Sequence, residues 1–316
     1  MSVSGPPASE ITLRFLAAPT DAGQSGSVSA GRVLEWIDKA GYAAAAGWSG
    51  TYAVTAYVGN VRFTRPVEVG ELVEVTARVV HTGRTSMHIT VEVSSGQPRN
   101  RELVPATRCL IIFVAVDGEG RSTPVRPFVP TTLAQELEER WAARRAELRA
   151  QVEAAMAGQV YTDAGSAPRV VMRFLAAPSD VNWGGKVHGG IVMRWIDEAA
   201  HVLATRWTGS AQNVAIFTGG VRFYRPLRIG HVVEVEARLL HTGRTSMHVG
   251  VHVRSGDPAE GPSGMELTTY CRTIFVGIDE QRRAVPCPTW VPVNDEDRAL
   301  DAHAVELVRI RDRFGD

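Results

Sequence analysis

The residues best suited to chemistry lie between positions 179 and 200, where a polar, glycine-rich loop leads into an apolar stretch with one acid. The loop carries Asn182, and the apolar spacing predicts a helix that begins around His188-Gly189-Gly190. Backbone amides at a helix start can donate to a carbonyl oxygen, and a carboxamide can donate a second hydrogen bond or hold a water molecule. A carboxylate such as Asp197 can act as a general base.

The spacing within this segment limits how these groups can cooperate. Asp197 follows Gly190 by seven residues, so the two share a helix face but stand about 10 Å apart along the axis. One carbonyl group therefore cannot contact both the amides of the helix start and the acid of the same helix. If both act on one substrate, the acid has to come from a second copy of the helix.

The chain contains that second copy, because it is an internal repeat. Arg14 to Pro19 recurs letter for letter as Arg173 to Pro178, an offset of 159 residues, and at this offset Asp38 matches Asp197. The eight residues from His81 to His88 also return unchanged, at 241–248. The sequence thus predicts a duplicated domain.

Each repeat predicts the same order of elements. An opening strand (Ile11 to Ala17; Val170 to Ala176) leads to the loop and then to one hydrophobic helix. Strands with period-two alternation follow, at 71–78, 89–93 and 106–116 in the first repeat and at 232–238, 249–253 and 267–278 in the second. One helix with about five antiparallel strands is typical of an α+β domain whose sheet wraps around a central helix.

These patterns divide the chain into two domains and two helical segments. We expect the domains at residues 8–130 and 167–290, a connecting helix at 131–158 and a C-terminal helix at 291–316. The connecting segment has no proline between 131 and 157 and is rich in Ala, Glu, Arg and Leu, which favours a charged surface helix.

Composition excludes several classes of protein. The 316 residues carry no net charge, which argues against bulk binding to nucleic acid or anionic membranes. The three cysteines are odd in number and scattered, so neither a disulfide framework nor a zinc site is expected. There is no signal-peptide pattern and no apolar run of transmembrane length, and we expect a soluble, cytoplasmic protein.

Several spaced motifs, taken together, resemble the hotdog-fold acyl-CoA thioesterases. They are the loop, His-Gly-Gly, the helix acid, Val-Arg-Phe-x-Arg-Pro (61–66 and 221–226) and Thr-Gly-Arg-Thr-Ser (82–86 and 242–246). The chain is most similar to the tandem-hotdog cytosolic acyl-CoA hydrolases and their single-domain bacterial relatives. The resemblance implies two hotdog domains whose sheets join side by side, with two composite sites at the junction. It also implies hydrolysis of fatty acyl-CoA to free fatty acid and coenzyme A, without a cofactor, by a trimer of such chains.

The two composite sites are expected to differ. The complete one combines three residues of the second repeat with two of the first, namely Asn182, His188 and Gly189 with Asp38 and Thr55. In the other, Asp197 faces a loop with Gly23, Ser29 and Ala30, and Ala215 stands in place of Thr55.

The resemblance suggests a role for each group. Asp38 is a general base, or a nucleophile through a mixed anhydride, while the amide of Gly189 or Gly190 polarises the carbonyl. Asn182 donates or holds the water, and His188 has a positioning role. Asp197 marks a possible second site.

The repeated Thr-Gly-Arg-Thr-Ser segment looks like the part of the family that meets the nucleotide end of coenzyme A. This assigns coenzyme A contacts to Arg84, Thr85 and Ser86 and to Arg244, Thr245 and Ser246. The alternative is a plain hairpin turn with a surface arginine. The pairs His81/His88 and His241/His248 lie seven residues apart and are expected on opposite strand faces, so no metal site is predicted.

Two other functions compete with hydrolysis. One is a non-catalytic acyl-CoA-binding or regulatory protein, which retention of Asp38 with Asn182 disfavours. The other is a hydratase acting on enoyl-CoA, whose Asp-and-His helix pattern is missing here. The sequence does not predict the preferred acyl chain length.

Overall fold

We analysed a computed structural model of the chain, which describes residues 9–100, 102–157, 159, 161–162 and 164–313. Within these residues eleven strands form one antiparallel sheet, in the order β1-β4-β5-β6-β2-β8-β11-β10-β9-β7, with β3 paired to β8. The first six strands belong to the first repeat and the last five to the second. The prediction of an α+β fold with two hotdog units is confirmed.

The strands of the first repeat are β1 (Glu10–Leu16), β2 (Ala53–Val58), β3 (Val61–Arg62), β4 (Leu72–Thr82), β5 (Ser86–Gly96) and β6 (Val104–Ala115). Those of the second are β7 (Arg169–Leu175), β8 (Asn213–Phe223), β9 (Val232–Thr242), β10 (Ser246–Gly256) and β11 (Glu266–Gly277). Their apolar residues alternate inward, so that Val73, Val75 and Ala77 of β4 are fully buried. The equivalent residues of β9, Val233, Val235 and Ala237, are buried to the same extent.

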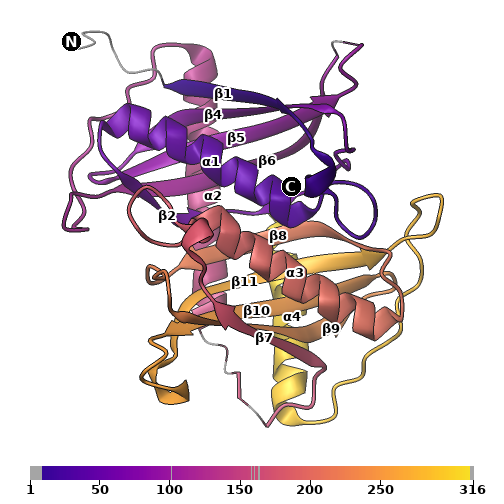
Figure 1. Cartoon of the computed structure of the whole chain (residues 1–316). Helices are drawn as coiled ribbons and strands as arrows, with labels where there is room; N and C mark the ends of the chain where they lie inside the picture. The colour runs from indigo at the N-terminus through magenta and orange to yellow at the C-terminus, as the bar shows by residue number, and fades with distance from the viewer. Residues whose placement is uncertain (1–8, 101, 158, 160, 163, 314–316) are drawn as a thin grey trace.

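The two repeats join through β2 and β8. Tyr57 and Val58 of β2 pair with Arg222 and Val221 of β8, and β3 adds a pairing of Val61 with Thr218. The sheet therefore runs without a break from one repeat into the other, as Figure 1 shows.

Two long helices lie side by side on one face of this sheet, α1 (Ala30–Ser49) and α3 (Gly189–Thr208) (Figure 1). Each ends at a glycine with positive φ, Gly50 at 69° and Gly209 at 71°, a conformation that costs other residues more. Their beginnings touch: a Cβ added to Gly190 would lie 2.7 Å from the Glu35 Cα, and one added to Gly31 would lie 2.9 Å from the Arg194 Cα. Glycine at these positions is what allows the helices to approach.

The opposite face of the sheet carries α2 (Leu133–Ala157) and α4 (Asp295–Arg313) (Figure 1). The prediction of a surface helix for the connecting segment is only partly right, because Leu148 and Val152 of α2 are buried against Leu307 and Ile310 of α4. The contact was not predicted because the helix is charged and carries almost no amphipathic pattern along its sequence. The predicted limits at residues 8, 158 and 314–316 lie outside the described residues.

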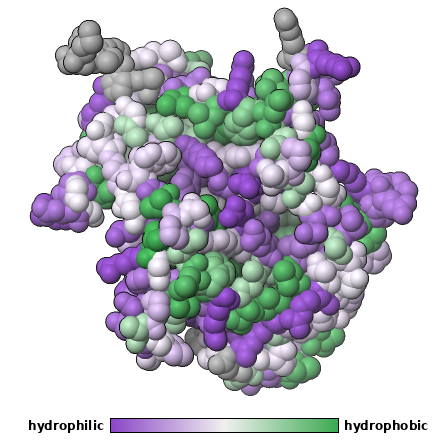
Figure 2. All heavy atoms as spheres, viewed as in Figure 1, coloured by the Kyte–Doolittle hydropathy of each residue, from purple (hydrophilic) through white to green (hydrophobic). Residues whose placement is uncertain are grey.

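On the face that carries α1 and α3, hydrophilic side chains gather across the middle of the molecule, between stretches of apolar surface (Figure 2). Within the described residues, no helix combines the length and the apolar character needed to cross a bilayer.

Candidate active site

The side-by-side helices bring each acid to the start of the other helix. The Gly190 amide of α3 donates to Asp38 Oδ2 of α1 at 2.8 Å, and the Gly31 amide of α1 donates to Asp197 Oδ2 of α3 at 2.9 Å. Each acid thus lies beside the helix start of the other repeat, as expected because the acid and the helix start of one helix are too far apart to act on one substrate. Two composite sites result, each with an acid from one repeat and a helix start from the other.

Asp38 has hydrogen-bond partners on both carboxylate oxygens. In addition to the Gly190 amide on Oδ2, the Thr55 hydroxyl of β2 donates to Oδ1 at 2.6 Å. His188 Nδ1 lies 3.0 Å from Oδ2, and the Asp38 side chain is buried. Bonds from two elements fix the plane of the carboxylate, while the oxygens keep further lone pairs for a substrate or water.

The start of α3 supplies an amide donor beside this acid. His188 is the N-cap, and its Nδ1 accepts from the Gly190 nitrogen at 3.1 Å. Gly189 is the first helical residue, and the described residues provide no acceptor for its amide. A Cβ added to Gly189 would stand 3.1 Å from both Asp38 Oδ2 and Thr55 Oγ1. Gly189 thus offers an unpaired donor at a position where only glycine fits without crowding the acid.

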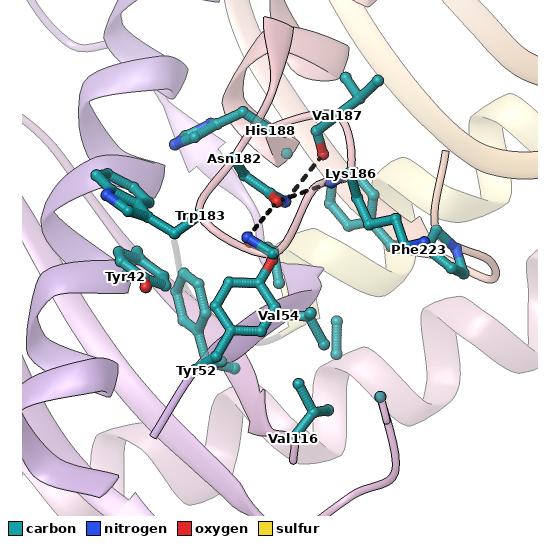
Figure 3. Close-up of a pocket in the computed structure, with 18 of the residues that line it drawn as sticks. Tyr42, Tyr52, Val54, Val116, Asn182, Trp183, Lys186, Val187, His188 and Phe223 are labelled. Carbon is teal, nitrogen blue, oxygen red and sulfur yellow. Dashed lines mark hydrogen bonds between the residues drawn. The ribbon is translucent and has the colours of Figure 1, made fainter. Parts of the chain in front are cut away.

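Asn182 organises the loop that precedes the helix. Its Oδ1 accepts from the amides of Gly184 and Lys186, at 2.9 and 3.0 Å, and its Nδ2 donates to the Val187 carbonyl at 3.3 Å (Figure 3). The side chain therefore holds the loop in one shape while it faces the cavity described next.

All five predicted catalytic residues line one cavity of about 830 Å³ at the junction, namely Asp38, Thr55, Asn182, His188 and Gly189. Further residues line it that the sequence analysis did not assign to the site, among them Tyr42, Tyr52, Trp183, Lys186 and Arg225. A comparison of the two loops would have singled out Trp183 and Lys186, because Gln24 and Ser27 replace them in the first repeat. Tyr42 and Tyr52 carry no such local signal, since they reach the site only through the contact between repeats.

The second composite site is a smaller cavity of about 420 Å³, lined by Gly23, Ser29, Ala215 and Asp197 among others. Ala215 pairs with Phe275 in the sheet as Thr55 pairs with Phe113, so it occupies the equivalent position without a hydroxyl. Asp197 Oδ1 has consequently no partner within the described residues, although it is buried. Burial raises the pKa of Asp197 to about 6, and the hydrogen bond from Gly31 offsets this only in part.

The six residues predicted to contact coenzyme A do not line either cavity. They lie in the tight turns of the β4–β5 and β9–β10 hairpins. The first turn adjoins the larger cavity: the Ala115 amide donates to the Thr85 carbonyl at 3.0 Å, and the next residue, Val116, lines that cavity. The copy at 84–86 is therefore the one beside Asp38.

The expectation that the paired histidines lie on opposite faces is wrong. His81 stands directly opposite His88 across the β4–β5 hairpin, and His241 is likewise paired with His248, with ring centroids 5.1 Å apart in both pairs. Side chains alternate between the two faces only along a single strand. Each histidine pair instead spans a hairpin, and residues directly opposite each other on adjacent antiparallel strands point to the same face of the sheet. The residues that the structure describes include no group of three or more His, Cys, Asp or Glu side chains placed to hold a metal ion.

The sequence was compared with known families and proteins. Residues 25–101 and 184–262 match the thioesterase superfamily, one segment in each repeat. The mouse cytosolic acyl coenzyme A thioester hydrolase is 23% identical over 304 residues, which cover 91% of this chain and 79% of that protein. The rat acetyl-coenzyme A thioesterase is 24% identical over 96% of this chain, which spans 57% of that longer protein.

A solved structure supports the fold over most of the chain. A Lactobacillus plantarum protein provisionally named an oleoyl thioesterase superposes with a TM-score of 0.60 over 86% of this chain and 98% of its own, at 12% identity. Two segments that match one family, one in each half of a continuous sheet, agree with the duplication read from the sequence. The chain belongs to the thioesterase superfamily and carries two copies of its hotdog fold.

Proposed function

We propose that the chain hydrolyses acyl-CoA thioesters to a carboxylic acid and coenzyme A at the larger junction cavity. The observation that carries the proposal is the meeting of a hydrogen-bonded carboxylate, Asp38, with the unpaired amide of Gly189 and the carboxamide of Asn182 on one cavity wall. The curated relatives, which are named as acyl-CoA and acetyl-CoA thioester hydrolases, support the choice of substrate.

The reaction needs a polarised carbonyl and an activated water. In our proposal the thioester oxygen accepts from the Gly189 amide, and a water held near Asn182 attacks the carbonyl carbon. Asp38 takes the proton of that water as the new C–O bond forms. The C–S bond then breaks, and the thiolate of coenzyme A leaves and is protonated from Asp38. No cofactor takes part in these steps.

Each chain has one complete site in this proposal. The smaller cavity keeps an acid and a helix start but lacks both the carboxamide and the hydroxyl, because Gly23 and Ala215 stand where Asn182 and Thr55 stand in the other site. Asp197 is thus a buried acid with one unpaired oxygen rather than an oriented base.

The nucleotide end of coenzyme A is proposed to meet the β4–β5 turn with Arg84, Thr85 and Ser86. This turn is supported over the copy at 244–246 because it adjoins Val116 and so the larger cavity. Arg84 is exposed, and a guanidinium can bind phosphate with two parallel hydrogen bonds.

Assembly into trimers and a cytoplasmic location complete the proposal. The outermost strands β1 and β7 end in the equivalent residues Leu16 and Leu175, which are 59% and 60% exposed and are suited to burial between chains. The number three comes from the family resemblance. The location is supported by relatives that are named cytosolic.

Release of free thiol from a series of straight-chain acyl-CoA substrates, from acetyl to palmitoyl, tests the proposed activity. We expect thiol release with at least one chain length, and its loss in Asp38→Asn. Tight binding of acyl-CoA by the folded wild-type chain, without thiol release at any length, would contradict hydrolysis and favour a binding protein.

A further inference from the structure

Three aromatic residues hold the Asn182 loop of the second repeat against the first repeat. Trp183, in the loop, stacks flat on Tyr42 of α1, with ring centroids 4.6 Å apart and an interplanar angle of 1° (Figure 3). Tyr42 in turn contacts Tyr52, which directly precedes β2, with centroids 5.9 Å apart. Two of the three rings thus come from the repeat that carries Asp38, and the third from the repeat that carries Asn182.

Tyr52 makes the closest of these contacts. A Cβ added to Gly184 would lie 2.4 Å from two ring carbons of Tyr52 and 2.6 Å from its hydroxyl, so the ring sits directly on the loop backbone. The Gly184 amide and the Asn182 side chain face this hydroxyl and act to lower its pKa. Burial nevertheless raises the pKa of Tyr52 to about 12, so the phenol stays neutral at physiological pH.

This contact completes the surroundings of the Asn182 side chain. Its Oδ1 and Nδ2 are already bonded within the loop, to Gly184, Lys186 and Val187. Those bonds set the shape of the loop but not its place relative to Asp38, because all the partners belong to the second repeat. Tyr52 is the partner that belongs to the first repeat, like Asp38 itself.

The second composite site provides an internal comparison. At the positions that correspond to Trp183, Tyr42 and Tyr52, the other half of the molecule has Gln24, His201 and Gln212, of which Gln24 and His201 line the smaller cavity. The stacked pair and the phenol are thus all replaced in the half of the molecule that also lacks the carboxamide. Other parts of the repeats, such as 81–88 and 241–248, are identical.

We propose that Tyr52 is a positioning residue for the reaction, which fixes the Asn182 carboxamide relative to Asp38 across the two repeats, with the Trp183–Tyr42 stack as a clasp. This inference rests on the proposed hydrolysis at the larger cavity. Because a displacement of about 1 Å in a reacting group can cost about 100-fold in rate, a contact that sets this placement acts on turnover.

Tyr52→Phe tests the hydroxyl alone, because it keeps the ring that packs on Gly184 and Tyr42. We expect kcat for acyl-CoA hydrolysis to fall about tenfold, as for loss of one positioning polar contact, with KM changed less than about twofold and Tm unchanged. In an Asn182→Ala background, Tyr52→Phe should cause no further loss, because the group it positions is gone.

The matched control is Tyr57→Phe, which removes a hydroxyl from a neighbouring tyrosine. Tyr57 lies on β2 and its ring packs against Arg149 of α2, outside the residues that line the cavity, so kcat should match the wild type. For the clasp, Trp183→Ala should lower kcat and Trp183→Phe should restore most of it. A Tyr52→Phe variant with wild-type kcat, or one whose loss adds fully to that of Asn182→Ala, would overturn the proposal. A wild-type protein that releases no thiol would instead overturn the proposed function.

Discussion

At the scale of single residues, one hydroxyl separates the two acids. Asp38 and Asp197 hold equivalent places on their helices, and both accept from the amide of a glycine at the start of the other helix. Thr55 then donates to the second oxygen of Asp38, whereas Ala215 leaves the second oxygen of Asp197 without a partner. The Asp38 carboxylate is therefore held in one orientation by bonds to both oxygens, whereas the Asp197 carboxylate is buried with one oxygen unpaired.

Replacing these acids one at a time should separate their roles. Asp38→Asn should reduce kcat about 100-fold or more, roughly 2.7 kcal/mol of barrier, because it removes the proposed base. Asp197→Asn should leave most of the turnover intact. Asn182→Ala should lower kcat too, and its loss should not add to that of Asp38→Asn, since both act at one site.

Steady-state rates of the three single variants and the Asp38/Asn182 double variant, with thermal melts to confirm folding, check this prediction. Loss of activity in Asp197→Asn together with retention of activity in Asp38→Asn would contradict the proposed pairing of the Asn182 loop with Asp38.

Asp197 should also leave a mark on stability. Its folded pKa of about 6 lies above the unfolded value near 4, so the folded state holds the proton more tightly. This contribution to stability is present below pH 4 and is lost as the pH rises through 6. Asp197→Asn stays neutral throughout and can still accept from Gly31, so its free energy of unfolding should rise relative to that of the wild type by about 2 kcal/mol between pH 4.5 and 7.5. Urea unfolding of both proteins across this range measures the gain; a difference that does not change with pH would contradict the prediction.

At the scale of elements, the paired hairpins offer a matched experiment. The turns at 82–86 and 242–246 have the same sequence, but only the first adjoins the larger cavity. Arg84→Ala should raise KM for acyl-CoA about tenfold with little change in kcat, since a phosphate contact made equally in ground and transition states affects binding alone. Arg244→Ala should leave KM unchanged. Equal, negligible effects of both variants would identify the two segments as plain turns.

The features that were predicted best from the sequence are those that occur in both repeats. The strands from β4 to β6 and their copies carry clear alternation, and Asp38, Asn182 and Gly189 were singled out by the family resemblance together with a comparison of the two repeats. The strands that join the repeats, β2 and β8, were not delimited, because buried neighbours on both sides remove the alternation of polar and apolar residues. Tyr52 was missed for a related reason: its partner is a backbone segment 130 residues away, and no local pattern marks it.

At the scale of the whole molecule, the sheet ends in two similar edges. The edge strands β1 and β7 each leave one side unpaired within the described chain and expose an equivalent leucine. We expect three chains to associate and cover such surfaces, giving six hotdog units. Light scattering on the purified protein should return a mass near three times 34.2 kDa. A single-chain mass throughout the micromolar range would contradict this expectation.

Buried histidines should make the whole fold sensitive to acid. Burial lowers the pKa of His248 and of His252, both on β10, to about 3, and Arg272 and Arg254 nearby oppose a further positive charge. Their Nδ1 atoms have no partner within the described residues. Burial lowers the pKa of His88, on the first repeat, to about 4.

Because these rings stay neutral when folded but have an unfolded pKa near 6.5, the unfolded chain binds more protons as the pH falls below 6.5. Stability should therefore decline steadily from pH 6.5 toward 4, by about 2 kcal/mol for each fully buried ring at pH 5, and the opposite contribution of Asp197 is smaller. Urea unfolding at several pH values measures the decline. In a His248→Gln/His252→Gln variant the slope should flatten, since glutamine takes up no proton; a variant that folds at neutral pH but keeps the wild-type slope would show that other groups cause the acid sensitivity.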